Sequence, residues 1–267
     1  MTRHVVLIII IAGLFSIHCS TVPITGRRQL SFISHSRLVE ASKDSYYDMI
    51  ESAELSDDPD KVRMVRNVGQ KIALAAEQFM RGHDMGDELE SYQWEFSLIQ
   101  DDATANAFAT PGGKIAVYTG ILPVARDENG LAVILGHEVA HSLANHAGER
   151  MSQLLLVRLG GVALSVAFGS YPVLTRQLLM TAYGAGANVG IILPYSRGHE
   201  SEADHIGLIL MAHAGYDPRS AIQFWQRMSS MEDQGRPPEF LSTHPAPERR
   251  IQDIRDMVPE AMKYYRR

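Results

Sequence analysis

Two histidines four residues apart, within an otherwise apolar stretch, constrain what this chain can fold into more than any other feature. The stretch reads Gly136-His137-Glu138-Val139-Ala140-His141. Positions i and i+4 lie on one face of a helix, one turn apart, so two imidazoles placed this way converge on one zinc ion. The glutamate between them can reach a water beside that ion and act as a general base. The alternative is a pair of unrelated histidines on a solvated helix.

The residues around this motif argue against the solvated alternative. Apolar side chains flank it at Leu131, Val133, Ile134, Leu135, Val139, Ala140 and Leu143. Imidazole and carboxyl groups on a mostly buried helix need partners, and a metal ion supplies them. We therefore expect a zinc-binding helix over residues 127–147, ended by Gly148. In such a site zinc lowers the pKa of a water, and Glu138 takes the proton as the water attacks a peptide carbonyl.

A catalytic zinc ion needs a third protein ligand, and the segment 196–204 offers candidates. Glu200 and Asp204 are spaced i, i+4, so Glu200 could bind the metal while Asp204 holds a histidine ligand through its other ring nitrogen. His199 lies on the wrong face of the helix if Glu200 is the ligand. Glu202 points roughly 200° away around the helix axis, and we expect it to face solvent. Spacing alone leaves the third ligand open.

Several ordered motifs resemble the HtpX/BepA/LoiP-type family of zinc metallopeptidases. The motifs are HEVAH at 137–141, ESEAD at 200–204, Thr243-His244-Pro245 with Arg250-Ile251 after it, Thr25-Gly26-Arg27-Arg28-Gln29-Leu30, and NAFATPGGKI at 106–115. Eukaryotic relatives of this family include the mitochondrial inner-membrane stress protease and the prenyl-protein protease. The resemblance covers nearly all of the chain that follows residue 18, and several motifs in order are far more specific than HExxH alone.

The resemblance implies a gluzincin fold, one zinc ion bound by His137, His141 and Glu200, and Glu138 as the catalytic base. It also places His244 beside the zinc, where two roles are open. His244 either donates a hydrogen bond to the oxyanion formed during hydrolysis or occupies the open position on zinc and shuts the enzyme off. We expect it to mask the zinc at rest and to act as a donor when its loop moves.

The residues that follow His244 complete this part of the site. Pro245 restricts His244 to extended conformations, and the resemblance favours Arg250 pinning the loop by pairing with a carboxylate. The alternative for Arg250 is a solvated side chain. Seventeen residues follow Arg250, so we expect no carboxy-terminal helical-repeat domain of the BepA kind.

The remaining patterns predict an α+β fold, a mostly helical zincin domain with a small antiparallel-containing sheet beside the zinc-binding helix. We expect helices at 36–55, 59–80, 196–213, 217–230 and from about 247, and strands at 92–99 and 114–119. Residues 106–119 form either a plain hairpin or an edge strand to which a peptide adds. The apolar segment 151–193 predicts buried or lid-forming helices, with a membrane hairpin as the alternative. We expect His146 to point away from the ligand face, as a helix-surface or capping histidine.

The amino terminus predicts an export signal. A short basic start precedes an unbroken apolar run at 5–15, which is too short to span a bilayer and fits the core of a signal peptide. The one cysteine of the chain, Cys19, follows at once, which favours a lipoprotein signal over residues 1–18 with lipid added to Cys19. The alternative is an uncleaved anchor. We expect residues 19–35 to form a tether and residues 36–267 to form the metallopeptidase domain.

These features predict a zinc endopeptidase that is lipid-anchored on the periplasmic face of the cell envelope, at the outer membrane. Its expected substrates are misfolded or stalled envelope proteins, an expectation that comes from the resemblance. The net charge of −6 argues against a nucleic-acid binder. Two alternatives remain: an envelope chaperone or assembly factor with a largely masked protease site, and a zinc-site protein without turnover. The sequence does not indicate the oligomeric state or the cleavage preference.

Overall fold

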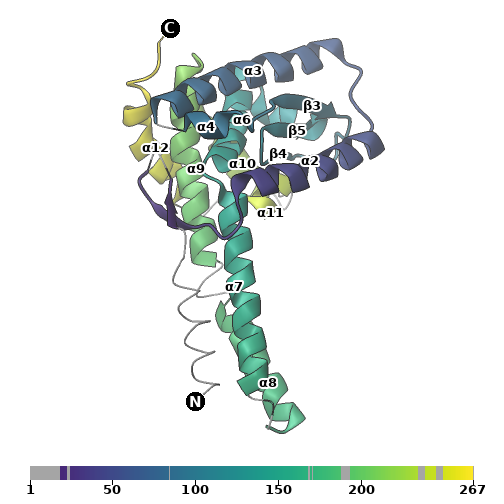
Figure 1. Cartoon of the computed structure of the whole chain (residues 1–267). Coiled ribbons are helices and arrows are strands. Elements are labelled where there is room, and N and C mark those ends of the chain that lie inside the picture. The colour runs from purple at the N-terminus through teal and green to yellow at the C-terminus, as the bar shows by residue number, and fades with distance from the viewer. Residues whose placement is uncertain are drawn as a thin grey trace.

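The structure is a computed structural model that describes residues 19–22, 25–83, 85–167, 169, 171–187, 193–233, 238–244 and 249–266. The expected signal peptide, residues 1–18, and Pro245 lie outside these residues. Most of the described chain is helical, and one three-stranded sheet lies against the helices (Figure 1). The predicted α+β class, mostly helical with a small sheet, is confirmed.

The helices of the described chain are α2 (His35–Ser52), α3 (Pro59–Gly82), α4 (Gly86–Leu89), η1 (Thr119–Ile121), α5 (Leu122–Ala125), α6 (Glu128–Leu143), α7 (His146–Ala167), α8 (Val173–Ala187), α9 (Leu193–His213), α10 (Ser220–Asp233), α11 (Glu239–Thr243) and α12 (Arg250–Ala261). Its strands are β1 (Cys19–Thr21), β2 (Arg28–Leu30), β3 (Glu95–Ile99), β4 (Ala107–Thr110) and β5 (Lys114–Tyr118).

Helices α3, α6 and α9 pack against one another and form the core of the main body (Figure 1). Helix α6 is apolar on nearly all sides and almost completely buried, as expected of a helix enclosed by others. It crosses α9 where Gly136 faces Gly207, and a Cβ added to Gly136 would lie 2.8 Å from the Gly207 carbonyl oxygen. The two glycines therefore allow the backbones of the two helices to approach closely, which brings the motifs at 137–141 and 200–204 together.

Local signals set the start of two of these helices. The Asp58 carboxylate accepts hydrogen bonds from the first backbone N–H groups of α3, and Pro59 occupies the first helical position. The Asp127 side chain caps α6 through Gly130 N. The end of α6 differs from the prediction: the helix stops at Leu143, and Asn145 takes a left-handed φ of 52°. Asparagine tolerates that conformation better than most residues, so the chain turns there and Gly148 lies inside α7.

The sheet has the order β3-β5-β4. Strand β5 pairs antiparallel with β4 and parallel with β3, so the sheet is mixed rather than purely antiparallel. Strand β4 is an edge strand of this sheet and packs beside α6. This arrangement places the segment at 106–110 next to the predicted zinc-binding helix.

Helices α7 and α8 form a hairpin that projects away from the main body (Figure 1). Its exposed large apolar side chains are Met151, Leu154, Leu155, Leu156, Leu159, Val162, Val166, Val173, Leu174, Leu178 and Leu179. By length and composition α7 could cross a membrane, and 11% of its most apolar 18-residue stretch is buried. The prediction of buried core helices over 151–193 is therefore wrong for the described part, because the hairpin extends beyond the body that would have covered it.

Candidate active site

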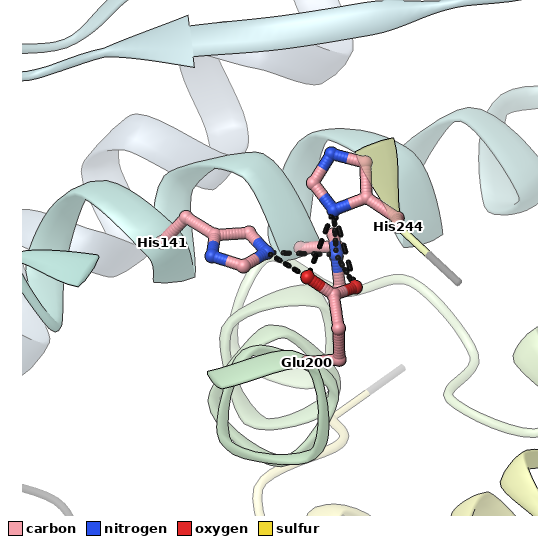
Figure 2. A group of neighbouring side chains, drawn as sticks. His141, Glu200 and His244 are labelled. Carbon is pink, nitrogen blue, oxygen red and sulfur yellow. Dashed lines mark hydrogen bonds and ion pairs between the residues drawn. The ribbon is translucent and has the colours of Figure 1, made fainter. Parts of the chain in front are cut away.

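Three side chains from two helices converge at the crossing of α6 and α9. The Nε2 atoms of His137 and His141 lie 3.0 Å apart. The Glu200 carboxylate reaches across from α9, with one oxygen 3.3 Å from His137 Nε2 and the other 3.4 Å from His141 Nε2. Figure 2 shows Glu200 pointing from its helix toward the rings of His141 and His244. The structure thus brings together the three residues that the resemblance gave as zinc ligands.

His244 joins this group from the end of α11. Its Nδ1 lies 3.1 Å from His137 Nε2 and 3.1 Å from a Glu200 oxygen. Its backbone N–H donates to Phe240 O at 2.8 Å, and its ring stacks on the Phe240 ring at 4.5 Å. His244 therefore lies within the cluster, as expected of a residue that masks the metal.

Glu138 lies beside the cluster and is buried. One carboxylate oxygen accepts a 3.0 Å hydrogen bond from Ala109 N of β4, and the other lies 3.2 Å from His244 Nε2. Burial raises the pKa of Glu138, against the lowering effect of the His244 and His137 imidazoles. A carboxyl group with a raised pKa is a stronger base, as a general base requires.

The donor atoms fit a zinc ion. One atom each from His137, His141, Glu200 and His244 lies within 4.8 Å of the others, and two imidazoles with a carboxylate are typical ligands of catalytic zinc. Burial opposes a charged imidazole, yet the carboxylates of Asp204 and Glu200 raise the pKa of His137 to about 9. The surroundings therefore favour positive charge at the point where the donors meet.

Asp204 and Arg250 hold His137 from behind. Asp204 Oδ1 lies 3.0 Å from His137 Nδ1, the ring nitrogen that faces away from the cluster. Arg250 makes a two-pronged ion pair with Asp204, at 2.8 and 2.9 Å, stacks over the Trp225 ring and donates to the His244 carbonyl at 3.2 Å. The solvated alternative for Arg250 is thus excluded. Burial raises the pKa of Asp204, but Arg250 and His137 outweigh it and hold that pKa below its usual range.

A second group of buried polar side chains lies behind His141, and the sequence interpretation missed it. His146 Nδ1 lies 2.7 Å from His141 Nδ1, and His146 Nε2 lies 2.9 Å from Glu202. Glu202 is 6% exposed and is paired with Arg27. The predictions that Glu202 faces solvent and that His146 lies on the helix surface are therefore wrong. The N-terminal hairpin, which consists of strands β1 and β2 and the turn with Arg27 between them, covers this face of α9 together with α7.

A cleft opens onto the cluster between the sheet and α7. Phe108, Ala109 and Pro111 line it on the side of the sheet, and Met151 and Leu154 line it on the side of α7. Only the base of α7 takes part in this lining. The first turns of α7 thus border the cleft, and the role of this segment as a lid stays a prediction.

The comparisons with known proteins agree with this site. The family model of peptidase family M48 matches residues 66–258. The chain belongs to peptidase family M48. It is 34% identical over 245 residues to the mitochondrial metalloendopeptidase OMA1 of Schizosaccharomyces pombe, covering 91% of this chain and 68% of that protein. By family and by site, it is a zinc metalloendopeptidase.

Other relatives match along similar stretches. The human metalloendopeptidase OMA1 is 31% identical over 251 residues, covering 92% of this chain and 47% of the human protein. The β-barrel assembly-enhancing protease of Yersinia pestis is 32% identical over 170 residues, covering 61% of this chain and 34% of that protein. The chain thus spans from about a third to about two thirds of the length of these relatives.

The predicted location of the protein also has to be corrected. The expected location, a lipid anchor on the periplasmic face of the outer membrane, is contradicted by the relatives. The OMA1 proteases of Schizosaccharomyces pombe and human, which are mitochondrial, match 91% and 92% of the chain, whereas the β-barrel assembly-enhancing protease of Yersinia pestis matches 61%. The apolar run before Cys19 suggested export, but such a run does not name a compartment. The described chain begins with Cys19 in strand β1, and lipid attachment there stays a sequence prediction.

Proposed function

We propose that this enzyme hydrolyses internal peptide bonds of misfolded or stalled proteins, which it binds as extended chains. The observation that carries the proposal is the position of β4. This edge strand borders the cleft, and its Ala109 N–H points at the general-base candidate Glu138. A substrate that adds to an edge strand is held by main-chain hydrogen bonds whatever its side chains are. Unfolded segments supply such chains and folded domains do not.

The residues around the cluster divide the chemistry among them. When bound to His137, His141 and Glu200, zinc supplies Lewis acidity that makes a water acidic and polarises the peptide carbonyl. Glu138 accepts the proton of the attacking water and passes it to the leaving amide nitrogen. The Ala109 N–H fixes the orientation of the Glu138 carboxylate. His244 Nε2, 3.2 Å from Glu138, is placed to donate to the oxyanion once its ring leaves the cluster.

The projecting α7–α8 hairpin supports action at a membrane. Between Glu149 and Glu200 the chain has no acidic residue, and its charged residues there are Arg150, Arg158, Arg176 and Arg197. The chain as a whole carries −6, so positive charge is concentrated on the segment with the exposed apolar side chains. Apolar side chains with arginines among them suit insertion into a bilayer with anionic head groups. The cleft at the base of α7 would then face polypeptides close to the bilayer surface.

Proteolysis is tested with the purified full-length chain. Zinc-loaded wild type should degrade casein, an extended protein, and leave a folded control protein intact, whereas a zinc-loaded Glu138→Gln variant should degrade neither. Glu51→Gln, a change at an exposed glutamate of α2, is the matched control. Intact casein in the presence of a fully zinc-loaded wild type would contradict the proposal.

Membrane association is tested by cosedimentation with vesicles of phosphatidylcholine, with and without phosphatidylglycerol. We expect wild type to sediment with the anionic vesicles and Leu159→Glu or Leu174→Glu to stay in solution. Leu74→Glu is the matched control, because Leu74 is an exposed leucine of α3 on the main body. Equal sedimentation of all four proteins would contradict the role of the hairpin.

The second candidate function is a chaperone or assembly factor whose protease site is largely masked. The position of His244 inside the cluster favours it, because an imidazole there competes with water for zinc. This function predicts that the Glu138→Gln variant still suppresses the aggregation of a denatured protein as well as wild type does. If wild type in the same assay binds clients and cleaves none of them, the chaperone function replaces the first proposal.

A further inference from the structure

The N-terminal hairpin reaches the buried polar group behind His141. Arg27 makes a two-pronged ion pair with Glu149 of α7, at 2.7 and 3.0 Å, and its Nε donates to Glu202 of α9 at 2.9 Å. The Thr25 hydroxyl also donates to Glu202. One guanidinium thus joins two helices and compensates two buried carboxylates, which would otherwise be costly to hold in the interior.

The hairpin is fixed in place by contacts of its own. Strands β1 and β2 pair antiparallel, and Gly26, with a φ of 65°, makes the turn between them. Val22 is fully buried in the main core. Just past β2, Phe32 N donates to the Ser152 hydroxyl of α7 at 3.0 Å. Contacts on both sides of Arg27 in the sequence therefore hold it against the body, and residues 19–35 do more than tether the domain.

The two hydrogen bonds between His141 and Glu202 both donate toward Glu202. If His141 binds a metal through Nε2, its proton lies on Nδ1, which then donates to His146 Nδ1 at 2.7 Å. His146 must accept at that nitrogen, so its own proton lies on Nε2 and is donated to Glu202 at 2.9 Å. Each partner thus fixes the tautomer of the next one. The ring of His146 is also held by stacking on His199 at 4.3 Å.

We propose that His146 is a positioning residue for the zinc ligand His141, and that Thr25 and Arg27 of the N-terminal hairpin act on the metal site through Glu202 and His146. The hydrogen-bonded series sets the ring orientation of His141 and increases the basicity of the nitrogen that faces the metal. A carboxylate on the far nitrogen of a metal-bound histidine has this effect. Here the carboxylate acts through a second imidazole, and the hairpin holds the carboxylate.

The test measures metal binding, so its result does not depend on which polypeptides the enzyme cleaves. Zinc affinity of the full chain is measured by competition with a chromogenic chelator, and the visible spectrum of the cobalt-substituted protein reports the ligand geometry. The variants are Arg27→Gln, Arg27→Lys, Glu202→Gln and His146→Ala. Arg28→Gln is the matched control, because Arg28 is the neighbouring arginine on the hairpin and is exposed. Thermal unfolding of the metal-free proteins gives the structural contribution separately.

We expect His146→Ala and Glu202→Gln to weaken zinc binding by roughly 10- to 100-fold, the usual effect of losing such a partner, and to change the cobalt spectrum. Arg27→Gln should weaken zinc binding by roughly 10-fold, with Arg27→Lys between it and wild type, because lysine keeps the charge and loses the two-pronged geometry. Arg28→Gln should match wild type. If the Arg27, Glu202 and His146 variants lose thermal stability while their zinc affinities and cobalt spectra stay unchanged, the residues are only structural and the proposal is overturned.

Discussion

The two histidines of the HEVAH motif are supported in different ways. His137 contacts the Asp204 carboxylate directly, and Arg250 from the C-terminal helix holds that carboxylate. His141 contacts His146, and His146 in turn contacts the Glu202 carboxylate, which Arg27 holds. Both carboxylates come from α9, and each is held by an arginine from a different end of the chain.

The difference shows how one chemical requirement is met at two distances. A metal-binding imidazole needs an acceptor on its far nitrogen, and Asp204 lies close enough to supply it. Glu202 lies on another face of α9, so the His146 imidazole connects it to His141. The Arg250 side chain is 4% exposed and that of Arg27 is 28% exposed. The support of His137 is therefore enclosed in the core, whereas the support of His141 lies close to solvent and depends on the hairpin staying docked.

The largest expected effect comes from a change that leaves both supports intact. Glu138→Gln should lower the rate of peptide hydrolysis by roughly 100- to 10,000-fold, because the attacking water loses its base. Zinc affinity should stay close to that of wild type, since Glu138 is outside both supports. Rates of casein cleavage and zinc content are measured on the same preparation. Retained cleavage by a zinc-loaded variant would show that another residue is the base.

His244→Ala tests the imidazole that joins the cluster from the end of α11, outside the two helices that carry the other donors. Its Nδ1 lies 3.1 Å from a Glu200 oxygen, its Nε2 lies 3.2 Å from Glu138, and its ring stacks on Phe240, so the ring can leave the cluster only when its loop moves. We expect turnover to fall by about 100- to 1000-fold, the usual cost of losing an oxyanion donor. Phe240→Leu, which weakens the stacking and keeps the imidazole, is the companion variant. A rise in turnover of His244→Ala would show that masking outweighs donation.

Asp204→Asn and Glu202→Gln compare the two supports directly. Each change removes a carboxylate charge at nearly constant shape, and each should weaken zinc binding by roughly 10- to 100-fold. We expect the larger loss for Asp204→Asn, because its contact with the ligand is direct and Arg250 loses its charge partner in the core. Chelator competition and urea unfolding are measured for both variants. A larger loss of zinc affinity for Glu202→Gln would reverse the comparison.

The sequence predicted the support of His137 better than the support of His141. Glu200 and Asp204 share an i, i+4 spacing, so both fall on the helix face that meets α6. Their association with HEVAH came from the resemblance, because spacing alone left the third ligand open. The pairing of Arg250 followed from the resemblance. The i, i+4 spacing that places Glu200 and Asp204 on one helix face can be read from the sequence.

The support of His141 depends on features that helical spacing does not report. His146 belongs to α7 because Asn145 turns the chain. In a helix continued through residue 147, the His146 side chain would point away from His141. Glu202 is buried because the N-terminal hairpin, some 175 residues earlier in the chain, covers that face of α9. The parallel pairing of β3 with β5 and the exposure of α7 and α8 are also outcomes of tertiary packing, which local patterns do not determine.

The smallest expected effect comes from moving both supports at once. Gly207 of α9 lies against α6, and a Cβ there would lie 2.9 Å from Gly136 C and from His137 N. Because Asp204 and Glu202 lie on the same helix as Gly207, Gly207→Ala should shift both carboxylates relative to the two histidines. The overpacked contact should lower the free energy of unfolding by about 1–3 kcal/mol.

Gly198→Ala provides the matched control in the same helix, because nothing lies within 4 Å of a Cβ added to Gly198. That change should leave zinc affinity unchanged and raise stability by about 0.5–1 kcal/mol, since alanine loses less backbone entropy than glycine. Urea unfolding and chelator competition are measured for both variants. The direct contact between Asp204 and His137 tolerates little displacement, whereas the two hydrogen bonds that join His141, His146 and Glu202 share the displacement between them. Adding Glu202→Gln to Gly207→Ala should therefore lower zinc affinity further than adding Asp204→Asn does. The shift caused by Gly207→Ala has already weakened the support from Asp204, so removing that carboxylate costs less.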